Sequence, residues 1–181
     1  LLAKEFVKNN FKVSYIFRNI TNVSNIPKVD DGVFLYPLNN YEINKNHLYE
    51  RDIKNILDEL NPNYIYHRNL NYFLSIANSY SKTKLCKTIW HISADKELYP
   101  WKIKFNKNIF KSYYLNKFLI DKGIKNTDYI IAQTETQSIS LQRRYNISPN
   151  LIVKNFHPTP LSPIVKSEKI KVTWIANFKE W

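Results

Sequence analysis

Short apolar runs alternate along this chain with segments whose apolar residues recur at helical spacing, and this alternation most constrains the fold. The strands that it predicts are Lys12–Phe17, Val33–Tyr36, Tyr64–Tyr66, Lys87–Trp90 and Asp128–Thr134, followed by a short Leu151–Val153. Their residues form continuous apolar runs, which is typical of parallel strands covered on both faces. Strands that alternate with helices in this way predict an α/β fold with a doubly wound parallel sheet.

The helices expected between these strands are Leu1–Asn10, Glu50–Leu60, Tyr72–Tyr80, one long basic helix or two over Ile109–Lys122, and Glu135–Tyr145. Pro37 is expected to close the second strand, and Gly123 to cap the helix before it. The chain contains no Met and opens on a helix pattern, so we expect a first strand to precede Leu1. A Rossmann-like sheet with that strand added is the predicted core.

The C-terminal part of the sequence indicates a domain boundary. Pro158, Pro160 and Pro163 lie between the last strand–helix unit and a fresh apolar strand, Ile170–Ala176. The expected organisation is an N-terminal domain over residues 1–156, a linker over 157–169, and the first strand of a truncated second domain over 170–181. A ligand bound between two such halves would have half of its site in the second.

The formal net charge of +12 indicates an anionic partner, or merely a Lys- and Asn-rich composition with no partner implied. Between Lys96 and Lys125, lysines far outnumber acidic residues and are interleaved with aromatic residues. This stretch fits an anionic membrane surface, single-stranded nucleic acid (the least favoured), or an ordinary helix with solvated lysines, which we favour. The candidate membrane contacts are Trp101, Lys104, Lys107 and Lys111.

Composition excludes several classes. Gly32 and Gly123 are the only glycines, too few for a glycine-rich phosphate-binding loop in this sequence. Cys86 is the only cysteine, which favours a reducing compartment. No apolar run approaches the roughly 20 residues of a spanning helix. We therefore expect a cytoplasmic protein, with peripheral contact to the inner face of the membrane as an alternative.

Ligands of doubly wound sheets bind beyond the carboxyl ends of the strands, where this chain places two histidines. His67 and Arg68 follow the third strand, and His91 follows the fourth, with Asp95 four residues later. An imidazole there can exchange a proton near neutral pH or hydrogen-bond a sugar hydroxyl or phosphate; the alternative is a half-buried His satisfied by backbone. The spacing does not predict a metal site, and Cys86 has no thiolate partner.

The run Asp128–Gln137, with Leu141–Tyr145 and Leu151–Asn155 after it, resembles GT-B glycosyltransferases of the family-4 type. In that family a strand precedes a helix, a short strand and a turn, and residues 171–181 resemble the first strand of its second domain. The resemblance covers about Tyr129–Trp181. Departures are Ala176–Asn177 in place of Gly-Arg, and Lys154–Phe156 in place of Pro-Asn-Gly. The family's pair of glutamates would lie beyond Trp181.

The resemblance implies the N-terminal, acceptor-binding half of a GT-B enzyme. The whole enzyme would move a sugar from a nucleotide-sugar donor to a glycan or lipid-linked acceptor, with retention, and without a metal or cofactor. His91 matches a histidine that lies close to the reacting sugar in that family, and is the expected catalytic residue. The expected acceptor-binding residues are His67, Arg68, Asp95 and Lys96, and the expected donor-binding residues are Thr134, Glu135 and Asn177.

Two other functions remain open at this point. A basic α/β module could bind nucleic acid or an anionic membrane surface without chemistry, and its affinity would then fall steeply with salt. An α/β enzyme such as a sugar-nucleotide epimerase would share the two-domain layout. Residues 1–181 alone are expected to be inactive as a transferase, because the donor half of the cleft would be missing.

Overall fold

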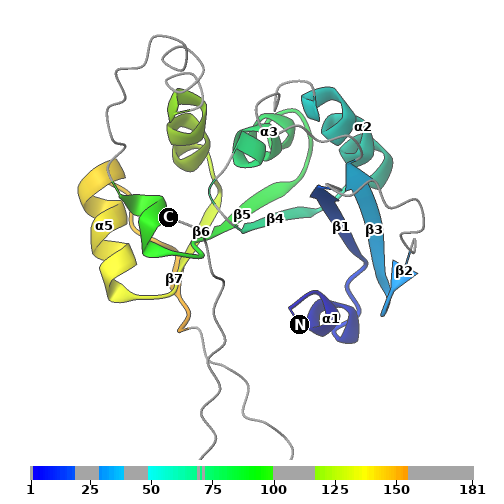
Figure 1. Ribbon diagram of the computed structural model, residues 1–181, viewed down its shortest axis with the longest axis horizontal. Helices are drawn as coiled ribbons and strands as arrows, with labels where there is room; N and C mark the ends of the chain where they lie inside the picture. Colours follow the sequence, from blue (N-terminus) through cyan, green and yellow to red (C-terminus); the bar gives the residue numbers. More distant parts are fainter. Residues whose placement is uncertain are drawn as a thin grey trace, which may run out of the picture.

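A computed structural model describes residues 2–18, 29–38, 49–68, 70, 72–99 and 117–154 (Figure 1). The elements, in order, are α1 (Leu2–Lys8), β1 (Val13–Arg18), β2 (Val29–Asp30), β3 (Val33–Leu38), α2 (Glu50–Leu60), β4 (Tyr64–Arg68), α3 (Tyr72–Ser81), β5 (Lys87–His91), the 3-10 helix η2 (Asp95–Leu98), β6 (Tyr129–Ala132), α5 (Glu135–Tyr145) and β7 (Leu151–Ile152). Residues 117–125 are also helical. The expected linker and second-domain strand, and the first part of the basic helix, lie outside the described residues.

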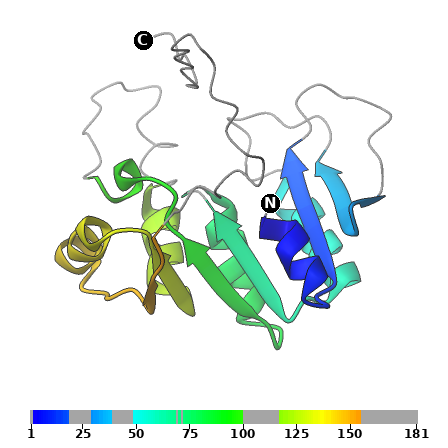
Figure 2. The same cartoon turned by 90° about the horizontal axis from the view of Figure 1, so that it is seen from below.

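The strands form two ladders. The larger has the order β4-β5-β6-β7, and all of its neighbouring strands are parallel, which confirms the predicted α/β fold with a parallel sheet. The smaller has the order β1-β3-β2, with β1 parallel to β3 and β2 antiparallel to it. The sheets lie edge to edge, with β1 beside β4 (Figures 1 and 2).

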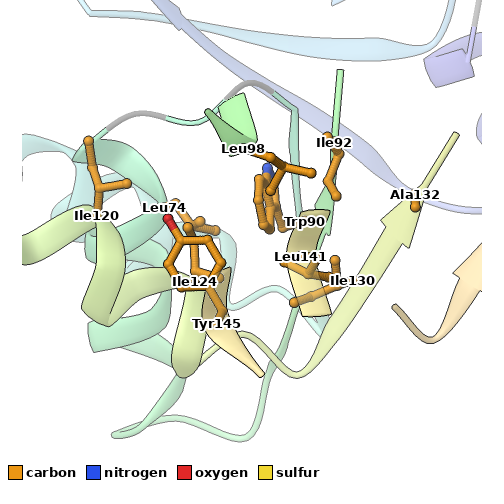
Figure 3. Close-up of a cluster of buried hydrophobic side chains, with 10 residues drawn as sticks. All are labelled: Leu74, Trp90, Ile92, Leu98, Ile120, Ile124, Ile130, Ala132, Leu141 and Tyr145. Atoms are coloured by element: carbon orange, nitrogen blue, oxygen red, sulfur yellow. The ribbon is translucent and has the colours of Figure 1, made fainter. Parts of the chain in front are cut away.

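The helices cover both faces of this arrangement, unequally. In Figure 1, α2, α3 and the helix over 117–125 lie above the sheets, and α1 lies below β1 and β3. Trp90, which is fully buried, lies in the middle of the apolar cluster between the larger ladder and the helices above it (Figure 3). That cluster comprises Leu74, Trp90, Ile92, Leu98, Ile120, Ile124, Ile130, Ala132, Leu141 and Tyr145. None of the helices in the described ranges combines the length and apolarity that crossing a membrane requires.

Two helices match their predicted bounds because their signals are local. The periodic apolar face of α2 buries Ile53 and Leu57, and Asn61 ends the helix in the left-handed conformation. The Thr134 hydroxyl accepts a hydrogen bond from the Gln137 N–H at the start of α5 (3.1 Å). Asn146 ends that helix as Asn61 ends α2.

Two expectations about helix and strand ends are wrong. Pro37 lies inside β3 rather than closing it, opposite Phe17 in the ladder. β2 pairs with β3 only at Val33 and Phe34, so the outer edge of β3 near Pro37 has no described partner strand. The missing N–H of Pro37 therefore costs no ladder hydrogen bond on that edge. Gly123 lies within the 117–125 helix, not beyond it. A Cβ at Gly123 would meet the Ser75 backbone nitrogen at 3.3 Å, so this glycine permits close packing on α3.

The hairpin between β2 and β3 was not predicted. Asp31 and Gly32 connect the strands with φ values of 48° and 79°. Positive φ at both central residues is typical of the tight turns that suit a twisted hairpin, and Asp-Gly is a favoured pair for them. Gly32 also packs against α1, since a Cβ there would lie 2.8 Å from Val7 Cγ1.

Gly32→Ala is expected to destabilise the protein by roughly 1–3 kcal/mol, because alanine is strained at positive φ and its methyl group would collide with Val7. Urea unfolding measures the change. Val7→Ala and the double variant complete a mutant cycle. In the Gly32→Ala background, Val7→Ala should relieve the collision but leave the backbone strain. Equal stability of Gly32→Ala and the wild type would contradict this account of the turn.

Candidate functional site

Three neighbouring strands bring a tyrosine, a histidine and a glutamine together toward the carboxyl ends of the larger ladder. His91 is the last residue of β5 and is half-buried. Its Nδ1 is hydrogen-bonded to the Tyr66 hydroxyl of β4, and its Nε2 lies 3.3 Å from Nε2 of Gln133, which follows β6. The Gln133 amide nitrogen can only donate, so a neutral His91 ring accepts at Nε2 and donates from Nδ1 to Tyr66.

A second set of hydrogen bonds fixes Gln133 to α5 and η2. The backbone N–H of Gln133 donates to Gln137 Oε1 (2.8 Å), and Gln137 Nε2 donates to Asp95 Oδ1 (2.9 Å). Gln137 is only 3% exposed, so its amide has little water to compete for these bonds. We refer to Tyr66, His91, Asp95, Gln133 and Gln137 as the His91 cluster. Its hydrogen bonds hold the imidazole in one orientation.

The site favours an uncharged imidazole. Burial lowers the pKa of His91 below its ordinary value, and the nearby positive charge of Arg68 lowers it further. Burial also raises the pKa of Tyr66, with Arg68 acting in the opposite direction. At neutral pH the ring is therefore neutral and the phenol is protonated. A neutral ring of this kind can hydrogen-bond a ligand hydroxyl by exchanging its long contact with Gln133.

Arg68→Gln is expected to raise the pKa of His91 while leaving it below the ordinary 6.5, because burial is the larger cause of the shift. An NMR titration of the imidazole resonances measures both values. Arg143→Gln, which removes an exposed guanidinium from the last turn of α5, is the matched control and should leave the His91 titration unchanged. An unchanged or lower pKa of His91 in Arg68→Gln would contradict the electrostatic account.

The expected acceptor-binding residues separate into different places. Arg68 is the ladder partner of His91 and lies on the same face of the sheet, with its side chain exposed. Asp95 belongs to the His91 cluster, and Lys96 is exposed beside it in η2. His67 is the ladder partner of Trp90, so the alternation of β4 places it on the opposite face, toward the helices. The structure thus brings Arg68 and Asp95 to His91, but not His67.

The expected donor-binding residues are only partly described. Thr134 is the N-cap of α5, and Glu135 is exposed in the first turn of that helix. Both follow β6, immediately after Gln133 of the His91 cluster. Asn177 and the candidate membrane contacts Trp101, Lys104, Lys107 and Lys111 lie outside the described residues.

Sequence reasoning missed Tyr66, Gln133 and Gln137. For Gln137 a signal was present, because Thr134 and Gln137 have the spacing of a capping box, in which the third helical residue reaches back toward the chain before the helix. Here Gln137 reaches the N–H of Gln133, one residue before the N-cap. Tyr66 and Gln133 had no comparable local signal, since Tyr66 is 25 and Gln133 is 42 residues from His91.

A cavity of about 190 Å³ lies elsewhere, on the helical face between α3 and the 117–125 helix. It is lined by residues of both helices, with Glu50 at one side and Lys82 and Lys122 among the others. It contains none of the residues that the sequence singled out as a site. In the described part of the chain, no group of three or more His, Cys, Asp or Glu side chains is placed to hold a metal ion.

Comparison of the chain with protein-family models gave no match, and a search of curated proteins gave none either.

Proposed function

We propose that this chain is the acceptor-binding part of a GT-B glycosyltransferase, which transfers a sugar from a nucleotide-sugar donor to a glycan or lipid-linked acceptor. The observation that carries the proposal is the His91 cluster. A neutral imidazole is held at the carboxyl end of an inner parallel strand, between a tyrosine and a glutamine, with an arginine in the neighbouring strand. This edge is where open α/β sheets bind their ligands.

The chemistry of sugar transfer suits these groups. The leaving diphosphate and the sugar develop opposite charges in the transition state, so a neutral ring beside the sugar orients a hydroxyl without adding a positive charge. Arg68 and Lys96 are exposed near the cluster and can attract an anionic ligand. His91 is the residue assigned nearest the reacting sugar, and Arg68 and Asp95 line the acceptor side. Retention of configuration follows from the family resemblance.

The proposed location is the cytoplasm, with peripheral contact to the inner face of the membrane. An acceptor carried on a lipid would have to be reached at that surface. The basic, aromatic stretch between Lys96 and Lys125 has the composition for such contact.

Isothermal titration calorimetry of the intact protein and of residues 1–181 with UDP, GDP and their sugars tests the proposal. Binding by the intact protein, together with none by residues 1–181, is the expected result, because the donor half of the cleft would lie beyond Trp181. Absence of binding to both proteins, with salt-sensitive binding of an oligonucleotide instead, would favour the basic binding module. Robust sugar transfer by residues 1–181 alone would also contradict the proposal.

A further inference from the structure

The two ladders meet at a gap. β1 ends one ladder and β4 ends the other, and they run side by side in the same direction (Figure 2). Strands that share hydrogen bonds lie about 5 Å apart. The Cα atoms of β1 and β4 lie for the most part more than 8 Å apart. Such a separation excludes direct pairing over most of their length and leaves room for an intervening strand, which would place the two edges about 10 Å apart.

Apolar side chains close this gap above and below. On the helical side, Ile16 of β1 and Ile65 of β4 pack against the same cluster of buried residues. On the other side, the Phe6 ring of α1 lies edge-on to the Tyr66 ring of β4, with centroids 6.3 Å apart. Backbone groups on the facing edges of β1 and β4 have no ladder partner among the described strands. Unpaired backbone groups between apolar layers are costly, so the gap calls for a strand that is apolar on both faces.

The right-handedness of crossovers between parallel strands determines which strand fits the gap. Crossovers between parallel strands are right-handed in about 98% of cases. The described crossovers with helices above the sheet step from β4 toward β7. α1 lies below the sheet, so a right-handed crossover through it must step in the opposite direction, toward β3. A parallel strand that reaches β1 through α1 therefore lies on the β4 side of β1, which is where the gap is.

We infer that the gap between β1 and β4 takes a parallel β-strand from the polypeptide on the N-terminal side of α1. The strand joins both ladders into one continuous sheet, with the inserted strand next to β4 and hence near the His91 cluster. It matches the six residues of β1 and the five of β4 in length, is rich in Val, Ile and Leu without Pro, and leads into α1 through a short loop. The inference is independent of the proposed function.

Hydrogen exchange tests this inference on the protein with its natural residues upstream of Leu1 and on a form that begins at Leu1. In the longer form, the amides of β1 and β4 that face the gap should exchange at least about 100-fold more slowly than in the shorter form. Amides of β5, which is paired on both sides, are the internal control. Equal protection in both forms, fast exchange in the longer form, or an upstream sequence without an apolar run would overturn the inference.

The shorter form could fail to fold, so a second measurement uses the longer form alone. Nuclear Overhauser effects between backbone protons should connect one upstream segment to both β1 and β4. Direct backbone contacts between β1 and β4, or contacts from another part of the chain to both edges, would overturn the inference.

Discussion

Replacing His91 with alanine is expected to lower kcat of the intact transferase by at least about 100-fold, and by up to about 10,000-fold if the imidazole also moves a proton. The neutral ring is held by Tyr66 and Gln133 at the edge where the sugar is proposed to react. Alanine removes the imidazole, whose Nε2 can accept a hydrogen bond from a sugar hydroxyl in exchange for its contact with Gln133. Initial rates with a nucleotide-sugar and an acceptor measure the loss, and thermal unfolding checks that the variant remains folded.

Two further variants locate the effect. His91→Gln retains a hydrogen-bonding group and should keep more activity than His91→Ala. His67→Ala is the matched comparison, since His67 lies in the neighbouring strand but on the opposite face of the sheet. A loss confined to position 91 supports a role beside the sugar. Near-normal turnover of His91→Ala, or an equal loss in His67→Ala, would contradict that role.

Replacing Trp90 with alanine is expected to cost about 3–5 kcal/mol in the free energy of unfolding. Trp90 is fully buried in the middle of the cluster that joins the larger ladder to α3, the 117–125 helix and α5. The loss combines the free energy that the wild type gains by transferring the indole from water to the core with the cost of the cavity left behind. Because a domain is typically stable by only about 5–15 kcal/mol, the variant would lose a large fraction of its free energy of unfolding.

Urea denaturation measures this cost, with two comparison variants. Trp90→Phe keeps much of the apolar volume and should lose less stability than Trp90→Ala. Leu85→Ala is the control for a large apolar side chain outside the core, because Leu85 is fully exposed and should change the free energy of unfolding by less than about 0.5 kcal/mol. A cost below about 1 kcal/mol for Trp90→Ala would contradict the expectation that the packing of the indole stabilises this cluster.

The parts of the fold that the sequence predicted are those with local causes. The bounds of α2 and α5 follow from apolar spacing and from the residues that end them, Asn61 and Asn146. The β2–β3 hairpin was missed although Asp31-Gly32 favoured it, because β2 has only two residues and no apolar run of its own. The prediction for Pro37 was wrong because a proline is tolerated within β3 only where β2 does not pair with it. How far β2 extends along β3 depends on strand pairing, which the local sequence does not show.

The site divides in the same way. His91, Arg68 and Asp95 could be found because each lies at or just after a predicted strand end. Tyr66 and Gln133 could not, because they reach His91 only through the parallel pairing of β4, β5 and β6. Neither residue type signals chemistry by itself. Their importance comes from the register, which no short sequence window contains.

The facing edges of β1 and β4 also bear on how the protein behaves in the test tube. An unpaired strand edge is a template for a strand from any other molecule. A polypeptide that starts at α1 would leave two such templates facing each other, and we expect it to form concentration-dependent oligomers by pairing of these edges between copies. The choice of the first residue to express would then decide whether a preparation is monodisperse, before any assay of activity begins.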